Sequence, residues 1–474
     1  MIEIVTIDTL SLGDRTYLAT DGAGALVVDP QRDIDRVLVV AAARGVPVTH
    51  VFETHMHNDY VSGGLALARR CGAAYHVNAA DQVGFDRVGI SDGDTIAVGE
   101  LMRVRVIATP GHTFTHLAYA LEDVTTGEVV AVFTGGSLLH GSTGRPDLLG
   151  PEHTLRLAAA QYVSARRLAL TLPDRTAVCP THGFGSFCAA GPAAAGTVAS
   201  TIGDEKRSNP ALILGCDSYV VRLVADLDAY PAYYAHMAAA NSAGPEDPDQ
   251  APPARVTAAD LGRRIAAGEW VVDLRHRRVF AAGHVPGSLS FEYGDSFASY
   301  LGWLIPWGTP LTLVGEAREQ IAAAQRDLAR IGIDRLSGAA VAGAGDWPGP
   351  RPLAAYPVSD FRELAAVRRG QRVTVVDVRR RAERAAGHID GAVHIPLHEL
   401  PGRVSELRRG PVWVHCQSGY RASIAASLLQ AAGHAVTAVD DDFSRAADAG
   451  LTPAGLTLAG RSAPASAAVA QAAG

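Results

Sequence analysis

Short apolar runs recur along this chain, and most of them end abruptly in polar residues and glycine. Gly45–Phe52 is one such run, and Val271–Leu274, Val375–Val378 and Val412–His415 are others. Runs of this length that are rich in β-branched residues and bounded by turn residues predict buried strands. In the second half of the chain each predicted strand is followed by a turn and a predicted helix. This alternation is typical of an α/β fold with a parallel sheet.

Histidines and a carboxylate follow the first predicted strand. His55, His57 and Asp59 lie within five residues of one another on the loop that leaves its carboxyl end, where α/β sheets build their sites. Such a loop can aim two neutral imidazoles and one carboxylate oxygen at a single cation. Loop histidines that are bonded only to the backbone are the alternative. Two later histidines, His112 and His182, also follow β-branched apolar runs, and together the motifs favour a metal site.

These motifs resemble the metallo-β-lactamase superfamily in order and spacing, and most closely its persulfide dioxygenase and glyoxalase II branch. The resemblance covers about residues 1–240 and includes Phe133–Gly135, Gly144–Leu148 and Asp204–Pro210. It implies an αββα sandwich, in which two β-sheets are flanked by helices and the loops that carry the histidines meet along one edge.

Two positions depart from the pattern of that branch. Gly136 stands where the branch normally has an aspartate that binds or bridges metal, and Tyr60 stands where it has a histidine. A dinuclear zinc centre of the glyoxalase type needs both groups, so two-metal thioester hydrolysis is not expected. Persulfide dioxygenases are similar but hold one ferrous ion with two histidines and that aspartate, which leaves open coordination positions. The resemblance carries over His55 and His112 but not the carboxylate.

We therefore expect one Fe(II) per chain, with three imidazoles as ligands: His55, His57 and His112. Asp59 and His182 are expected behind them, where they would orient ligands or bound water. Zinc in the same place, or no metal at all because the usual aspartate is missing, are the alternatives.

The chain repeats itself after about residue 255. Val271–Arg275 matches Val375–Arg379, and Ala282–Gly287 matches Ala386–Gly391 at the same spacing. Such self-similarity predicts two domains of the same α/β architecture.

A thiol follows a predicted strand in the second copy. Cys416 lies directly after Val412–His415, and Ala422 begins a predicted helix rich in alanine and leucine. Backbone amides of such a loop and the amino end of the helix stabilise a thiolate or a bound anion. Gly419 lets the loop curl, and Arg421 can hold an anionic substrate. A buried structural cysteine is the alternative.

Asp-x-Arg, Gly-His-x-x-Gly and Cys-x4-Arg in one frame resemble the rhodanese sulfurtransferases, which carry sulfane sulfur as a persulfide on the loop cysteine. The resemblance makes Cys416 the nucleophile and Arg421 the group that binds thiosulfate or a comparable anion. The loop amides are then expected to contact the substrate, and they belong to Gln417, Ser418, Gly419 and Tyr420. The first copy has Gly315–Arg318 in the corresponding place and no cysteine, so it is expected to be an inactive spacer or docking surface.

Length and composition support several domains. A chain of 474 residues with 48% hydrophobic content can bury several cores. The expected organisation has five segments: a metallo-β-lactamase-like domain (1–240), a linker (241–254), a rhodanese-like domain without the cysteine (255–348), a rhodanese domain with it (353–461) and a disordered tail (462–474).

Charge and cysteine content limit the expected binding partners and the expected cellular compartment. A net charge of −7 without a basic block argues against nucleic-acid binding. Five cysteines without a Cys-x-x-Cys pair fit a reducing cytoplasm. Neither a signal peptide nor an uncharged apolar run of about 18 residues is visible, so no membrane association is expected.

The whole sequence predicts an enzyme of sulfur metabolism that removes reactive sulfide species. An iron site would oxidise a small-molecule persulfide to sulfite, and Cys416 would exchange sulfane sulfur with that product, making or consuming thiosulfate. A mononuclear zinc thioester hydrolase with an independent rhodanese domain is one alternative. A non-catalytic scaffold in which only Cys416 is active is another. Whether the chain forms a homo-oligomer stays open.

Overall fold

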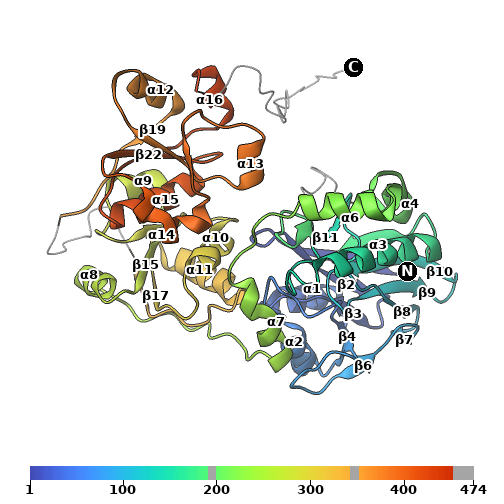
Figure 1. Cartoon of the computed structure of the whole chain (residues 1–474). Helices are drawn as coiled ribbons and strands as arrows, with labels where there is room; N and C mark the ends of the chain where they lie inside the picture. The colour runs from blue at the N-terminus through green and yellow to red at the C-terminus, as the bar shows by residue number, and fades with distance from the viewer. Residues whose placement is uncertain (191–198, 342–351, 452–474) are drawn as a thin grey trace, which may run out of the picture. The chain divides into compact units, whose positions relative to one another are not determined.

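Two six-stranded β-sheets form the N-terminal part of the computed structural model, which describes residues 1–190, 199–341 and 352–451 (Figure 1). The first sheet has the order β1-β2-β3-β4-β5-β6, with strands Glu3–Thr9, Asp14–Thr20, Ala25–Val28, Val48–Phe52, Ala74–Asn78 and Val88–Ile90. The second has the order β14-β12-β10-β9-β8-β7, with strands Ser200–Thr201, Ala177–Pro180, Glu128–Gly135, Leu117–Asp123, Met102–Ala108 and Thr95–Val98. A short antiparallel pair joins β11 and β13, Thr143–Gly144 and Ala189–Ala190.

Helices cover the outer faces of both sheets. They are α1 to α6: Asp35–Arg44, Gly64–Cys71, Thr154–Thr171, Ile202–Ser208, Pro210–Ile213 and Cys216–Ala225; α7, Tyr234–Ala243, follows them in the chain. Leu18 of β2 packs in one core with α1 and α2, whereas its neighbours Tyr17 and Ala19 pack in the core that also holds Tyr119 and Phe133 of the second sheet. A third core joins the second sheet to α3 to α6. Alternation along the strands therefore builds the αββα sandwich that the resemblance implied.

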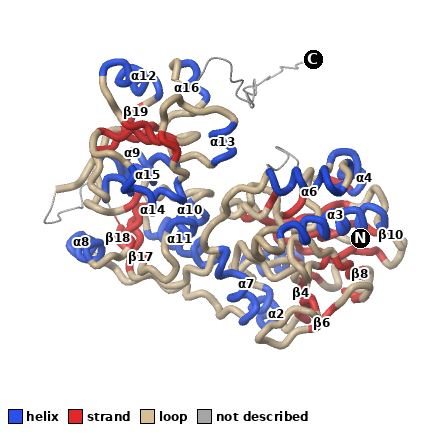
Figure 2. Tube along the Cα trace, in the orientation of Figure 1, coloured by secondary structure: helices blue, strands red, loops and turns tan. Residues whose placement is uncertain are grey.

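The rest of the described chain is α/β with parallel strands (Figure 2). It begins with α8, β15, α9, β16, α10, β17, α11 and β18: Ala258–Ala266, Trp270–Asp273, Arg277–Ala282, Leu289–Ser290, Phe297–Leu304, Leu311–Gly315, Arg318–Arg330 and Gly338–Val341. Strand β15 pairs with β16, and β17 pairs with β18, in both cases parallel.

The C-terminal sheet has the order β19-β23-β22-β20-β21, and its strands are Val358–Ser359, Ala435–Val439, Pro411–His415, Thr374–Asp377 and Val393–His394. All of its pairings are parallel. Its helices α12 to α16 are Phe361–Gly370, Arg381–Ala385, Leu400–Arg403, Tyr420–Ala431 and Ser444–Asp448, and short 3-10 turns cover Leu397–Glu399 and Val404–Glu406.

The described chain divides into two compact units. One contains Met1–Asp260, and the other contains the C-terminal sheet together with Leu261–Ala266 and Val271–Glu292. The expected linker begins later than the sequence indicated, because α7 extends to Ala243. The other expected domain boundaries stay a prediction, and the expected tail 462–474 lies outside the described residues.

The internal repeat has a structural counterpart in a buried ion pair. Arg275 donates to both carboxylate oxygens of Asp273 and to the carbonyl of Gly283, at 2.7–3.0 Å. In the second copy, Arg379 donates to both oxygens of Asp377, at 2.8–3.0 Å, and to the carbonyl of Gly387 at 2.7 Å. Each pair ties the end of one strand to the turn that enters the next.

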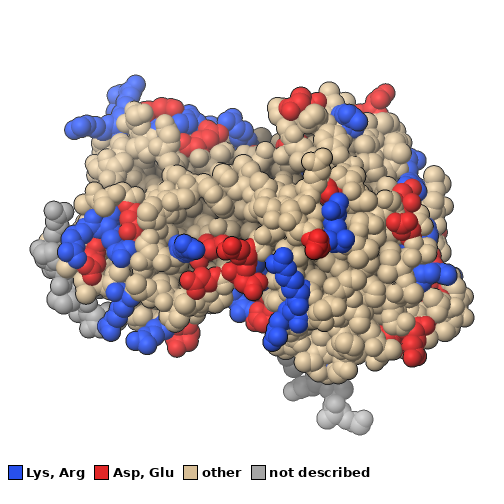
Figure 3. Space-filling view, turned by 90° about the horizontal axis from the view of Figure 1, so that it is seen from below, with Lys and Arg blue, Asp and Glu red and all other residues tan. Residues whose placement is uncertain are grey.

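One face of the molecule carries charged side chains of both signs. On the face seen in Figure 3, blue and red side chains are interspersed over the described residues. Among the described helices, none combines the length and the apolar character needed to cross a membrane.

The buried pair in the C-terminal sheet can be tested by removing one partner. Asp377→Ala leaves the Arg379 guanidinium buried without its carboxylate, and we expect the free energy of unfolding of this domain to fall by about 3–5 kcal/mol. Hydrogen exchange of β20 and β22 in urea measures it. The double variant Asp377→Ala/Arg379→Met, which removes both charges, should lose less of the free energy of unfolding. Asp448→Ala, at an exposed position, should change it little. A double variant as unstable as the single one would contradict the bracing role.

Candidate functional site

Four histidines from three loops gather at one edge of the sandwich. His55 and His57 follow β4, His112 follows β8, and His182 follows β12. All four are buried. The ring centroid of His182 lies 5.3 Å from those of both His55 and His112, and 5.6 Å from that of His57. The structure therefore brings together the histidines that the sequence placed at separate strand ends.

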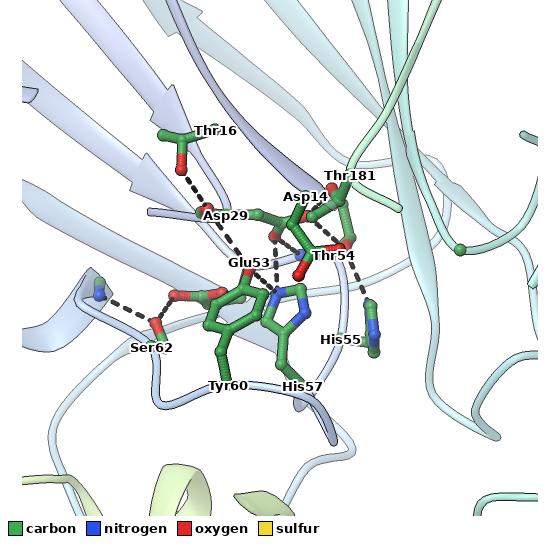
Figure 4. A network of polar contacts seen from close by, with 12 residues as sticks. Asp14, Thr16, Asp29, Glu53, Thr54, His55, His57, Tyr60, Ser62 and Thr181 are labelled. Atoms are coloured by element: carbon green, nitrogen blue, oxygen red, sulfur yellow. Dashed lines mark hydrogen bonds and ion pairs between the residues drawn. The ribbon is translucent and has the colours of Figure 1, made fainter. Parts of the chain in front are cut away.

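A buried carboxylate at the end of β3 organises these loops (Figure 4). Asp29 accepts hydrogen bonds from the backbone N–H and the hydroxyl of Thr54, both at 2.7 Å, and from the hydroxyl of Thr181. Its φ of 51° is left-handed, which no other non-glycine residue of the described chain adopts. Left-handed backbone at a non-glycine residue costs about 1–3 kcal/mol and marks functional sites. Sequence analysis missed Asp29, since a single aspartate before proline indicates only a turn.

His57 faces carboxylates. Its Nε2 lies 3.2 Å from oxygens of both Asp29 and Glu53, and 3.0 Å from the hydroxyl of Tyr60. Burial lowers the pKa of His57, but these two carboxylates outweigh it and raise the pKa to about 9. A protonated Nε2 has no lone pair for a metal. In this arrangement His57 is the counter-ion of two buried acids, and its expected role as a ligand stays a prediction.

His55 and His182 present Nε2 to one another at 3.4 Å. The Nδ1 of His55 lies 2.9 Å from the Thr54 hydroxyl, whose own proton goes to Asp29, so Nδ1 is the donor and Nε2 keeps its lone pair. His182 Nδ1 lies 2.9 Å from Asp14 and 3.1 Å from Asp59. Burial opposes the charge on His182, but these carboxylates raise its pKa. A metal ion would take the place of the second proton.

His112 is the clearest candidate ligand. Its Nδ1 donates to the carbonyl of Arg145 at 2.8 Å, and its buried Nε2 has no hydrogen-bond partner. Burial and the neighbouring His182 lower the pKa of His112 to about 3, so the ring is neutral. Its ring fills the space of the missing aspartate, since a Cβ on Gly136 would lie 2.6 Å from His112 Cγ.

The donor set fits a metal ion. One ligand atom each of His55, His57 and His182 lie within 4.8 Å of one another, and the same holds for His112, His182 and Cys188. His182, which the sequence placed behind the ligands, therefore belongs to both groups. Asp59 and Asp14 both stand behind His182, at its Nδ1, and the role expected of Asp59 stays a prediction. A backing carboxylate of this kind fixes the ring of a metal-binding histidine.

The thiol of Cys416 lies on the loop between β22 and α15. It is buried, and its Sγ accepts a hydrogen bond from the Gly419 N–H at 3.2 Å. Gly419 has a φ of 89°, and a Cβ there would meet the Asp440 side chain and lie 3.0 Å from its Cα, so glycine is needed for this turn. Ser418 is exposed, and Gln417 and Tyr420 are half-buried. The helix begins at Tyr420, two residues earlier than predicted.

Arg421 forms a bidentate ion pair with Glu383 of α13, with both N–O distances at 2.6 Å. Sequence analysis did not identify Glu383. Arg421 is thereby fixed beside the first turn of α15, and its expected contact with an anionic substrate stays a prediction. His415, directly before the thiol, is also new: it is buried, neither ring nitrogen has a hydrogen-bond partner, and its Nε2 lies 3.9 Å from an Asp377 oxygen.

Family models match two regions of the chain. The model of the Metallo-beta-lactamase superfamily matches residues 15–182, and the model of the Rhodanese-like domain matches residues 360–448. The second region contains Cys416 and Arg421. The first contains all four histidines of the cluster.

Curated relatives are similar to the N-terminal part. A hydroxyacylglutathione hydrolase of Polaromonas sp. is 31% identical over 163 residues, which cover 34% of this chain and 57% of that protein. The hydroxyacylglutathione hydrolase of Acidiphilium cryptum is 31% identical over 227 residues, which cover 45% of this chain and 91% of that protein. The chain thus spans little more than half of the first relative and nearly all of the second.

A solved structure extends the similarity further. The structure of a metallo-beta-lactamase from Staphylococcus aureus subsp. aureus COL superposes with a TM-score of 0.64 at 26% identity and covers 72% of this chain and 99% of that one. This share is larger than residues 1–182 can supply, so the likeness continues past the last histidine of the cluster. The chain belongs to the metallo-beta-lactamase superfamily and carries a rhodanese-like domain in its C-terminal part.

Proposed function

We propose that this chain is an enzyme of sulfur metabolism in which Cys416 carries sulfane sulfur. The observation that carries the proposal is the position of this thiol, at the carboxyl end of β22 with the Gly419 amide directed at its sulfur. A backbone amide and the amino end of a 12-residue helix both stabilise negative charge at that point. Cys-x4-Arg is the loop length associated with sulfur transfer.

The transfer step is a nucleophilic displacement. The Cys416 thiolate attacks the outer sulfur of thiosulfate, an S–S bond forms as the S–S bond of thiosulfate breaks, and sulfite leaves with the electron pair of that bond. Charge is conserved, since thiolate and thiosulfate become persulfide anion and sulfite. The loop amides of residues 417–421 would hold the persulfide. An acceptor thiolate or cyanide then removes the outer sulfur.

The N-terminal domain is proposed to act as a metal-dependent persulfide dioxygenase. The net reaction converts RSSH, O2 and H2O into RSH, sulfite and two protons. Support comes from the neutral His112, whose free Nε2 is directed into the cluster, and from His55 and His182 beside it. A ferrous ion held by these imidazoles would supply open positions for oxygen and a sulfur substrate. Its product, sulfite, is the leaving group of the Cys416 reaction, which links the two activities.

The names of the curated relatives favour a second candidate for this domain. Hydroxyacylglutathione hydrolases are named for a glutathione thioester, so a mononuclear zinc site that hydrolyses a thioester is the alternative. Tyr60 and Gly136 weaken it, because they remove two donors of a dinuclear centre. Both candidates share a low-molecular-weight thiol as the carrier of the substrate.

Cys416→Ser should abolish sulfur transfer from thiosulfate to cyanide, because serine cannot form the persulfide. Thiocyanate formation measures this activity, and mass spectrometry of the intact chain after thiosulfate treatment should show one added sulfur in the wild type only. Cys71→Ser, at a half-buried cysteine of α2, is the matched control and should retain the activity. Thiocyanate formation by Cys416→Ser at the wild-type rate would overturn the assignment.

His112→Ala should remove the neutral donor of the metal site. We expect bound metal per chain and oxygen uptake with glutathione persulfide to fall by about 100-fold or more. The protein is purified without oxygen, and its iron and zinc are quantified before the assay. His50→Ala, a half-buried histidine of β4 outside the cluster, is the control. If the protein binds zinc, hydrolyses a thioester and takes up no oxygen, the alternative holds. If it shows neither oxygen uptake nor thioester hydrolysis, Cys416 is the one remaining catalytic group.

A further inference from the structure

Cys188 lies among the histidines of the N-terminal cluster. Its Sγ and one ring nitrogen each of His112 and His182 lie within 4.8 Å of one another, and all three side chains are buried. The buried Nε2 of His112 has no hydrogen-bond partner. No motif named in the sequence analysis includes this cysteine.

We propose that Cys188 is a metal ligand, and that its thiolate supplies the anionic donor that Gly136 cannot. This inference rests on the metal site of the proposed function and concerns its ligand set. When the metal–sulfur bond forms, the thiol proton leaves to solvent, and the site gains one negative charge, as it would with a carboxylate. With His112 and His182 as neighbours, the donor set becomes imidazole and thiolate.

The carboxylates of this region lie beside other side chains than His112. Asp29 and Glu53 contact His57, and Asp14 and Asp59 contact His182 from behind, through Nδ1. Asp147 is likewise paired, with Arg145 at 2.7 Å. Among the possible metal-binding groups of the described residues, the one that contains His112 has Cys188 as its anionic donor.

Backbone hydrogen bonds hold Cys188 in register with His112. The N–H of Arg145 donates to the carbonyl of Cys188 at 2.8 Å, while the carbonyl of Arg145 accepts from His112 Nδ1 at 2.8 Å. The β11–β13 pairing of Gly144 with Ala189 continues this contact, and Cys188 N–H donates to the Ser186 hydroxyl at 3.2 Å. One residue, Arg145, thus positions both donors, and a preorganised ligand pair is what a metal site requires.

A thiolate changes which metals the site accepts. Soft sulfur donors combined with imidazole suit zinc and also iron, whereas a set of carboxylates suits magnesium or calcium. With His55, His112, His182 and Cys188 bound, a tetrahedral zinc would have no open position, whereas a six-coordinate iron would keep two. With these four ligands, a zinc-loaded site would have no place for a substrate, whereas an iron-loaded site would.

Cobalt(II) absorption tests the proposal without relying on activity. The full chain is prepared metal-free and without oxygen in the Cys416→Ser background, which removes the other reactive thiol, and is titrated with Co(II). We expect a thiolate-to-cobalt charge-transfer band in the near ultraviolet at one Co(II) per chain. Adding Cys188→Ser should abolish the band and weaken Co(II) binding by about 10-fold or more. Adding Cys179→Ser instead, at the other cysteine near the site, should leave the band unchanged.

The outcomes separate this inference from the function on which it rests. Co(II) bound at one per chain without the band, or a band that survives Cys188→Ser, would overturn the ligand assignment and leave the metal site intact. No bound Co(II) would overturn both. If Cys188→Ser does not fold, X-ray absorption of the zinc-loaded Cys416→Ser protein decides, because a sulfur neighbour at about 2.3 Å supports the assignment and nitrogen and oxygen neighbours alone overturn it.

Discussion

The N-terminal site depends on one buried carboxylate, that of Asp29. It ends β3 in a left-handed conformation and binds Thr54 from the loop after β4 and Thr181 from the loop after β12. Two loops that are far apart in sequence are thereby fixed at the same edge. Through the Thr54 hydroxyl, Asp29 also sets the Nδ1 proton of His55 and leaves its Nε2 free. Because Asp29 is fully buried, its negative charge must be balanced, and this requirement shapes its neighbours.

Charge balance shapes the surroundings of His57. Asp29 and Glu53 place two carboxylates on one side of the imidazole, and a proton held between them stabilises both. A histidine at position 60 could serve as a metal ligand, but Tyr60 instead sets its hydroxyl against His57 Nε2. The pattern His-x-His therefore does not by itself make both rings ligands. The tertiary environment decides what faces each nitrogen: the two carboxylates beside His57 face its Nε2, whereas those beside His182 face its Nδ1.

Much of the architecture followed from the sequence, because it depends on local patterns. Strand and helix patterns predicted the parallel C-terminal sheet, and the resemblance carried by the strand-end motifs implied the sandwich and the meeting of the histidine loops at one edge. The roles of Asp29 and Glu53 could not be predicted, since each is a single residue without a motif and acquires its partners only through contacts between distant loops. The same is true of Glu383, which meets Arg421 across the C-terminal domain.

The buried ion pair of the Asp-x-Arg motif, here called the clamp, is present in both copies of the α/β unit. Asp273 with Arg275 and Asp377 with Arg379 make the same bonds, including one to a glycine carbonyl in each copy. Both clamps close a strand end, yet only the second copy has a thiol on the later loop. The clamp therefore belongs to the stability of the α/β unit and not to sulfur transfer. A loop can lose its cysteine without loss of the fold, because the buried ion pair that orders the sheet lies on another strand.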